Sequence, residues 1–171
     1  MSKQPPTATE LASLIDLLGS KMGPARQKAR EDLVAHGQHA TPSVIEALRT
    51  SPSNQVRWEA AKALGEIGDA RSIPALVDAL TDSDPDVAWL AAAALKPFEK
   101  AAWPRVLRAL IKDETDSLCL RKGAHRVFVH EEEEGVNDLL ATLVQALTPY
   151  GAPAPAKSAA SELLARLTAA P

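Results

Sequence analysis

The sequence contains few of the residues on which disulfide-stapled and β-sheet proteins depend. Cys119 is its one cysteine, so no disulfide can form within the chain. Aromatic residues make up 4% of the sequence, whereas strands are enriched in aromatic and β-branched residues. The chain has 8 glycines in 171 residues, and alanine and leucine, which favour helices, are abundant. The composition therefore predicts an all-α protein.

Long apolar runs and an excess of one charge are also missing. The apolar run at residues 87–95 falls far short of the roughly 18 residues that indicate a membrane span. The formal net charge of −3 gives no general signal for nucleic acid, whose protein partners usually carry a basic domain or stripe. The first residues, MSKQPPTATE, lack the charged and apolar segments of a secretory signal. We therefore expect a cytoplasmic protein with no membrane partner.

One seven-residue pattern occurs five times along the chain. Each copy opens with a small residue or proline and carries aliphatic residues in its centre and at its end. The copies are ASLIDLL (12–18), PSVIEAL (42–48), PALVDAL (74–80), PRVLRAL (104–110) and ATLVQAL (141–147). Their starts lie 30, 32, 30 and 37 residues apart, and a period near 32 is typical of stacked helical repeats.

A second helix is expected between successive copies and after the last one. We align these helices through an apolar or small first residue, a small residue four positions on and an aliphatic residue eight positions on. The first residues of the five helices are then Ala25, Val56, Val87, Cys119 and Pro155. On this alignment Cys119 is expected to be buried and unreactive, because a free cysteine in such a position behaves as a small apolar residue.

The third and fourth repeats depart from the regular pattern. Pro97 is expected to end a second helix early, because proline lacks the amide that continues a helix. Asp116 is a candidate N-cap for the second helix of the fourth repeat, as Asp84 is for that of the third. Trp103 is expected in the core. The acidic run at 131–134 is expected to form a solvated loop or helix end that lengthens the fourth repeat.

The best-formed part of the chain is the stretch at 56–95, which contains V-R-x-x-A-A-x-A-L-G, I-G-D and I-P-x-L-x-x-A-L in that order. This series resembles the HEAT repeats found in phycobilisome-lyase-like proteins. The resemblance implies a right-handed α-α superhelix, a solenoid of about five HEAT-like helical pairs, in a single domain at 7–169 after a polar tail at 1–6. It also implies that Arg57 pairs with Asp82 in the turn of the neighbouring repeat. The repeats are expected at about 7–37, 40–68, 70–99, 101–131 and 135–169.

The residues give little support to an enzyme or a metal site. The HEAT-like deoxyhypusine hydroxylases bind two irons through several His-Glu pairs, and this chain has one such pair, His130-Glu131. His36 and His39 have a spacing that could ligate a metal, but no carboxylate or thiolate cluster accompanies them and zinc needs three or four ligands. A catalytic set assembled from distant residues stays open. We expect a non-enzymatic protein with no cofactor.

Positions two, three and six after each aligned first residue point away from the predicted core on a helical wheel. In a stacked solenoid of this type they line the concave face, where such proteins usually bind. Five basic side chains against two acidic ones, Glu31 and Glu59, predict a partner of anionic character. The candidate binding residues are Trp58, Trp89, Lys62, Arg121, Lys122, His125, Lys28 and Lys157.

Trp58 and Trp89 occupy equivalent positions in adjacent repeats. With packed helices about 10 Å apart, the two indoles could form one anchoring surface for a partner. A tryptophan at this position can equally lie flat along its own helix and fill the groove to the next repeat. The sequence leaves both interpretations open.

The function that these features favour is a protein-protein interaction module, an adaptor or scaffold, that binds its partner on the concave face. One alternative is a nucleic-acid binder, such as the HEAT-like alkylpurine DNA glycosylases, whose inner surface is basic and aromatic. Another, which the resemblance implies, is a phycobilin-lyase-like chaperone, although no residue demands a pigment. A monomer is favoured, and the identity of the partner stays open.

Overall fold

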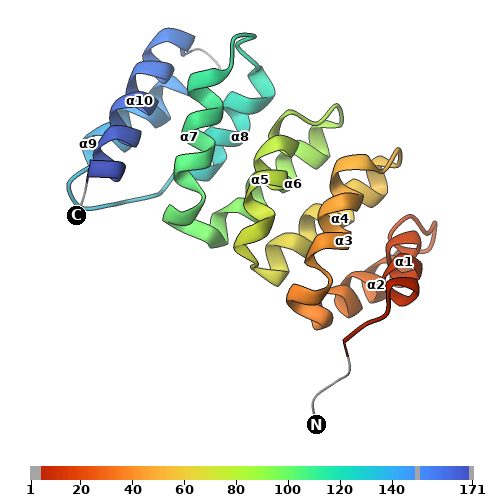
Figure 1. The fold of residues 1–171 in the computed structure, drawn as a ribbon. Helices are drawn as coiled ribbons and strands as arrows, with labels where there is room; N and C mark the ends of the chain where they lie inside the picture. Colours follow the sequence, from red (N-terminus) through yellow and green to blue (C-terminus); the bar gives the residue numbers. More distant parts are fainter. Residues whose placement is uncertain (1–4, 149–150, 170–171) are drawn as a thin grey trace.

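The computed structural model describes residues 5–148 and 151–169, and this part of the chain consists of helices and loops without strands (Figure 1). The all-α prediction is therefore confirmed. The expected polar tail lies within the described residues only at Pro5 and Pro6. The α-helices are α1 (Ala8–Leu17), α2 (Gly23–His36), α3 (Thr41–Thr50), α4 (Asn54–Ile67), α5 (Ile73–Asp78), α6 (Pro85–Leu95), α7 (Trp103–Lys112), α8 (Leu118–Phe128), α9 (Asn137–Ala146) and α10 (Pro153–Ala169). Short 3₁₀ helices are η1 (Gly37–His39), η2 (Ala70–Ser72), η3 (Ala79–Thr81) and η4 (Lys96–Ala101).

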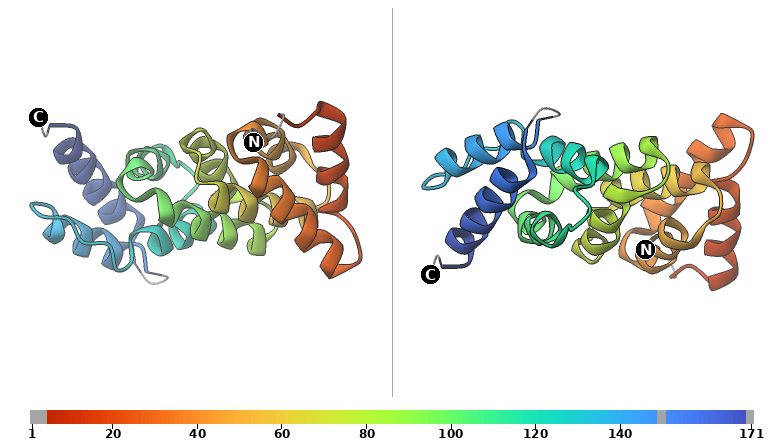
Figure 2. Two further views of the ribbon diagram at one scale, coloured as in Figure 1. Left: turned by 90° about the horizontal axis from the view of Figure 1, so that it is seen from below. Right: turned by 90° about the horizontal axis from the view of Figure 1, so that it is seen from above.

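The helices stack as antiparallel pairs in two layers, which makes the chain an elongated solenoid (Figure 2). The first layer holds α1, α3, α5 and α7, and the second holds α2, α4, α6 and α8, each packed on the next helix of its layer. The space between the layers is filled by leucine, valine and alanine side chains that form one continuous core. Each repeat thus contacts mainly its neighbours, as expected of a repeat protein.

Polar side chains and glycines fix where the second-layer helices begin and end. The Oγ atom of Ser53 accepts a hydrogen bond from the amide of Val56 at 3.4 Å, and a carboxylate oxygen of Asp84 accepts one from Val87 at 3.2 Å. These bonds satisfy amides that have no partner within the first turn of a helix. Gly68 ends α4 in the left-handed conformation, with φ 69°. The sequence therefore sets the ends of these helices locally.

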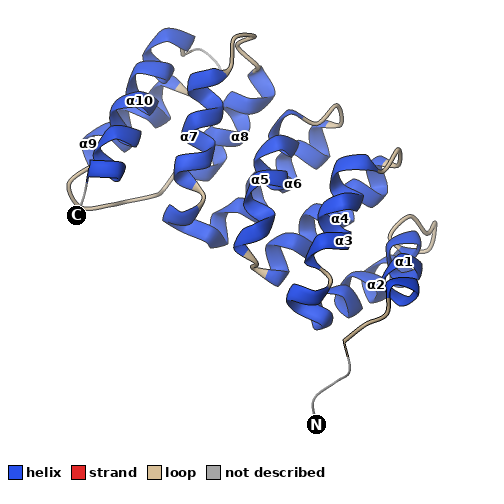
Figure 3. Ribbon diagram, viewed as in Figure 1, coloured by secondary structure: helices blue, strands red, loops and turns tan. Residues whose placement is uncertain are grey.

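The third repeat breaks as the sequence predicts. Helix α6 ends at Leu95, and Pro97 lies in the 3₁₀ segment η4 that follows. Figure 3 shows the chain as a series of helices joined by loops. Trp103 at the start of α7 is buried, and its ring meets that of Phe128 edge to face with 5.8 Å between centroids. Both sequence-based expectations, a shortened second helix and a core tryptophan, are confirmed.

The start of α8 corrects the sequence-based alignment by one residue. Ser117, and not Asp116, caps α8 by accepting a hydrogen bond from the amide of Leu120 at 3.2 Å. The cause lies in the preceding loop, where the carboxylate of Asp113 accepts a hydrogen bond from the amide of Ser117 at 2.7 Å and Asp116 takes a positive φ of 51°. Leu120 therefore occupies the buried position assigned to Cys119, and the Cys119 side chain is exposed.

Small residues let the second-layer helices approach closely. A Cβ atom placed on Gly65 of α4 would lie 2.8 Å from the Cβ atom and 2.9 Å from the Cα atom of Ala94 in α6. Real Cβ atoms do not approach other atoms so closely, so only glycine fits at this crossing. The alanine-rich face of α6 is thus the means by which α4 and α6 pack with little space between their backbones.

The last helical pair is present, but its two helices lie in exchanged layers (Figure 1). Helix α10 packs on α7 and α9, and α9 lies beside α8, so the second helix of this pair joins the first layer. The loop at 129–136 is held on η4, because Glu133 lies 2.5 Å from Lys100 and Glu131 lies 3.9 Å from Lys96. The acidic loop is thus in contact with η4 just before α9 begins beside α8, and α10 takes the place on α7.

Candidate functional site

Arg57 and Arg121 occupy equivalent positions, each the fourth residue after the N-cap of its helix. Arg57 donates to both carboxylate oxygens of Asp82 at 2.8 and 2.9 Å and to the carbonyl of Ser51 at 2.9 Å. The ion pair implied by the HEAT resemblance therefore forms, and it ties one repeat to the next. Both of its side chains are largely buried, so it is less screened by solvent than a surface pair.

Arg121 is a structural residue and does not lie on the binding face where the sequence alignment placed it. Its side chain is 8% exposed, and its Nη2 atom donates to the carbonyl of Thr148 at 3.0 Å and to the carbonyls of Ala146 and Gly151. The carbonyl of Ala146 belongs to the last residue of α9, and those of Thr148 and Gly151 follow it, so these acceptors lack helical partners. Arg121 therefore holds the last helical pair on α8, just as Arg57 joins the second and third repeats.

Lys157 also leaves the predicted binding face. It lies on α10, which packs in the first layer against α7, and its Nζ atom donates to the carbonyl of Asp113 at the C-terminal end of α7. A lysine there satisfies a carbonyl with no helical partner and complements the helix dipole. Of the five basic residues predicted to share one face, Arg121 and Lys157 have structural roles elsewhere.

Glu59 is a buried acceptor and not a surface charge. The residue is 3% exposed, and its carboxylate lies 2.6 Å from Arg30 Nη1 and 3.5 Å from Arg26 Nε. Arg30 is also 3.1 Å from Glu66, so the four side chains join α2 to α4. The corrected face has therefore lost an acidic group as well as two basic ones.

The first repeat contributes few free charges to the face. Lys28 lies 2.5 Å from Asp32, and Gln27 donates to Glu31 at 2.8 Å, so these side chains pair within α2. His125 of α8 is half-buried. Neither Lys28 nor His125 lines the groove between α6 and α8 described below.

Trp58 and Trp89 each carry a cation over the ring, but the two side chains differ in exposure. Trp89 is 54% exposed and is stacked by the guanidinium of Arg126, whose Cζ atom is 3.8 Å from the ring centroid. Trp58 is half-buried against the core, and Lys62 Nζ lies 4.6 Å from its ring centroid. Of the two interpretations left open by the sequence, an exposed indole describes Trp89, whereas Trp58 also contributes to packing.

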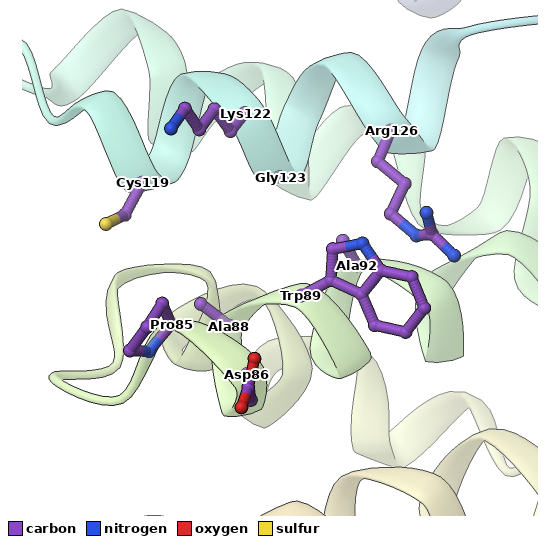
Figure 4. Close-up of a pocket in the computed structure, with 9 residues that line it drawn as sticks. All are labelled: Pro85, Asp86, Ala88, Trp89, Ala92, Cys119, Lys122, Gly123 and Arg126. Atoms are coloured by element: carbon purple, nitrogen blue, oxygen red, sulfur yellow. The ribbon is translucent and has the colours of Figure 1, made fainter.

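A groove of about 500 Å³ runs between α6 and α8 beside Trp89 (Figure 4). Its wall of small residues comes from both helices, and Lys122 extends from α8 above it. Trp89 and Arg126 lie near one end, and Cys119 lies near the N-terminal ends of the two helices at the other. The lining residues are Pro85, Asp86, Ala88, Trp89, Ala92, Cys119, Lys122, Gly123 and Arg126.

The cations beside the two indoles have no carboxylate partner among the described residues. No acidic oxygen of residues 5–148 or 151–169 lies within ion-pair distance of Arg126, Lys122 or Lys62, although other cations of the chain are paired. Arg126 Nε is buried without a hydrogen-bond acceptor, so its free donors are the two terminal nitrogens. A guanidinium held flat by an indole is preorganised to accept a carboxylate from outside the chain.

Arg126 was absent from the sequence-based candidates because of the one-residue error in α8. With Leu120 in the position of Val56, Arg126 follows it by six residues, just as Lys62 follows Val56. The available signal was Ser117, an equally good N-cap next to Asp116. With Ser117 as the cap, the wheel would have kept Lys122, added Arg126 and left out Arg121 and His125.

The described residues hold no cluster of three or more His, Cys, Asp or Glu side chains arranged to bind a metal ion. His36 instead lies 3.5 Å from Glu10 of α1, across the first helical pair. In the same part of the chain, no helix combines the length and the apolar character needed to cross a membrane.

Comparison with known proteins identifies the repeats. No curated protein matches this chain. The family model for HEAT repeats matches residues 41–125, which run from the start of α3 into α8 and include both tryptophans and most of the groove. The matched helices belong to the part of the chain that stacks in two regular layers. The chain is therefore a HEAT-repeat protein.

Proposed function

We propose that this protein is a non-enzymatic interaction module, an adaptor or scaffold, that binds an acidic segment of a partner protein on the face formed by α4, α6 and α8. HEAT repeats commonly serve as scaffolds for protein interactions, which supports the general class. The observation that carries the proposal is the stack of Trp89 and Arg126, an exposed indole under a cation that has no acidic partner among the described residues.

The chemistry of this face favours a protein with carboxylate side chains. A large exposed aromatic ring and an arginine are the residue types that dominate binding energies at protein interfaces. Lys122, Arg126 and Lys62 add three positive charges around the two indoles, in a chain whose formal net charge is −3. That local field would attract an anionic segment and orient it on approach.

The nucleic-acid alternative receives less support from the corrected face. Arg121 and Lys157 no longer extend the row of cations, so the basic residues beside the indoles are Lys62 of the second repeat and Lys122 and Arg126 of the fourth. A nucleic-acid site needs several phosphate contacts along its length, and its affinity falls steeply with salt for each of them. A short patch with an exposed indole suits one anchored peptide segment better.

Affinity capture tests the proposal most directly, with the wild-type protein and the Trp89→Ala variant as baits in parallel. We expect the variant to lose its partner, because truncation of an anchoring aromatic costs about 2 kcal/mol or more, or about thirtyfold in Kd. Leu17→Ala is the matched control, since Leu17 is an exposed apolar residue of α1 far from this face. Equal capture of the same proteins by all three baits would refute the proposed surface.

A further inference from the structure

The groove between α6 and α8 lies beside the one regular second-layer helix that lacks an arginine at its fourth position. Arg26, Arg57 and Arg121 each follow the N-cap of their helix by four residues, and Ala88 follows Asp84 by the same interval. Where arginine is present, its side chain occupies the space next to its helix and bonds to neighbouring backbone. Alanine leaves that space open.

The bonds of the other arginines show what the missing side chain would do. Arg26 and Arg57 each donate to the carbonyl six residues earlier in the chain, those of Ser20 and Ser51, at 2.7 and 2.9 Å. For residue 88 the equivalent acceptor is the carbonyl of Asp82. An arginine at this position therefore has a ready backbone partner and would fill part of the groove without disturbing the helix.

The open groove combines an apolar wall with a basic rim. Ala88, Ala92 and Gly123 present only small groups, and a Cβ atom on Gly123 would lie 2.8 Å from Leu80 Cδ2, so a larger residue there would have to displace the end of the Leu80 side chain. Lys122 and Arg126 stand above this wall, while Asp86, the one carboxylate of the lining, lies near the N-terminal end of α6. Arg126 thus lies at the Trp89 end of the groove, whereas the Lys122 side chain extends along α8 toward the Cys119 end and lies across the groove from Asp86 (Figure 4).

We propose that this groove is the specificity pocket of the binding face, and that it receives one apolar side chain of the partner segment. A neighbouring carboxylate of the same segment binds Arg126 and Lys122 at the rim. The inference rests on the proposed function and adds that an acidic segment without an apolar residue binds poorly. A volume of about 500 Å³ is ample for one leucine or phenylalanine side chain and adjoining backbone.

The test refills the groove by the Ala88→Arg substitution and measures the binding of two synthetic peptides by calorimetry. One peptide is a run of aspartate and glutamate with a central leucine, and the other has serine in place of that leucine. We expect the wild-type protein to bind the leucine peptide at least about tenfold more tightly, a difference of about 1.4 kcal/mol. The variant should lose this preference while keeping its thermal stability.

The charge of the new side chain lets Ala88→Arg distinguish pocket filling from electrostatic attraction, because an added arginine raises the positive potential of the face. If electrostatic attraction alone governed binding, Ala88→Arg would strengthen the binding of both peptides. Ala88→Gln fills the groove without charge and keeps the test valid if the arginine variant fails to fold. Ala165→Arg, on an exposed position of α10, is the control for added charge.

The outcomes separate this inference from the proposed function. Loss of the leucine preference in both position-88 variants, with Ala165→Arg unchanged, supports the pocket. If the wild-type protein binds both peptides equally and the Trp89→Ala variant binds neither, the pocket is wrong and the acidic-segment surface stands. If neither peptide binds the wild-type protein, both the pocket and the proposed function are overturned.

Discussion

Arg121 offers a sharp test of the corrected α8 register. The sequence alignment places it on the predicted binding face, whereas in the structure its side chain contacts the last helical pair. Its Nη2 atom donates to the carbonyls of Thr148, Ala146 and Gly151, and Asp116 lies 3.5 Å from Nη1. The Arg121→Ala substitution removes these bonds together. The carbonyls at the end of α9 would then depend on solvent that reaches them only in part.

The size of the effect follows from the number and kind of bonds lost. A hydrogen bond to a charged group contributes about 1.5–3 kcal/mol, and the three carbonyls share one donor nitrogen, so they count as fewer than three full bonds. We expect Arg121→Ala to lower the free energy of unfolding by about 3 kcal/mol. In a protein of this size that loss corresponds to roughly 6–12 °C in Tm.

The assay is thermal unfolding followed by circular dichroism, combined with hydrogen exchange to locate the loss. Since stability in a repeat protein is shared between neighbouring repeats, exchange should rise first in α9 and α10. Arg126→Ala is the matched control from the same helix: we expect it to cost under about 1 kcal/mol of stability, because its cation–π contact is at the surface. If Arg121→Ala kept full stability and weakened binding of the acidic peptide as Arg126→Ala does, the structural role given to Arg121 would be wrong.

Three further predictions concern packing, pH and the thiol. Gly65→Ala should destabilise the protein, because overpacking against Ala94 costs about 1–3 kcal/mol and offsets or exceeds the helix-propensity gain of about 1 kcal/mol. Urea unfolding would measure the change in stability. A more stable variant would contradict the close approach of α4 and α6. The hydrogen bonds from Arg71 lower the pKa of Asp69 from 3.8 to about 2, so their contribution to stability is present above pH 3.8 and is lost as the pH falls toward 2. The difference in unfolding free energy between the wild-type protein and Asp69→Asn should therefore shrink over that pH range. A difference that stays constant would refute this prediction. Cys119 should react with iodoacetamide in the folded protein at a rate close to that in denaturant, because its side chain is exposed. Strong protection in the absence of a partner would mean that Cys119 is buried, as the sequence alignment predicted.

Much of the fold could be predicted because its determinants are local. The end of α6 follows from Pro97, and the start of α4 from Ser53, since each acts on the backbone within one helical turn. The repeat period then places successive pairs side by side without further information. Trp103 is buried for a similar reason, because it precedes a proline at the start of a helix whose apolar face meets the core.

The proposed binding face was predicted only in part, because it depends on register and on long-range packing. A choice between two adjacent caps, Asp116 and Ser117, moved every side chain of α8 by about 100°, which placed Arg121 on the predicted face and left out Arg126. The exchange of α9 and α10 between layers has no local signal, since it is seen only in the packing of α10 on α7, whose residues lie far apart in the sequence. Trp58 and Trp89 needed no such correction, because the register of α4 and α6 was right.

The central claim, that an acidic segment binds the face of α4, α6 and α8, is tested most directly by the indole N–H resonances of the three tryptophans. In a titration of the ¹⁵N-labelled protein with the leucine-containing acidic peptide, we expect the Trp89 resonance to shift most, the Trp58 resonance to shift less and that of buried Trp103 to remain in place. The shifts should weaken with added salt, because the rim charges lie at the surface. No movement of Trp89 while the peptide binds elsewhere, or an equal shift of Trp103, would contradict the account.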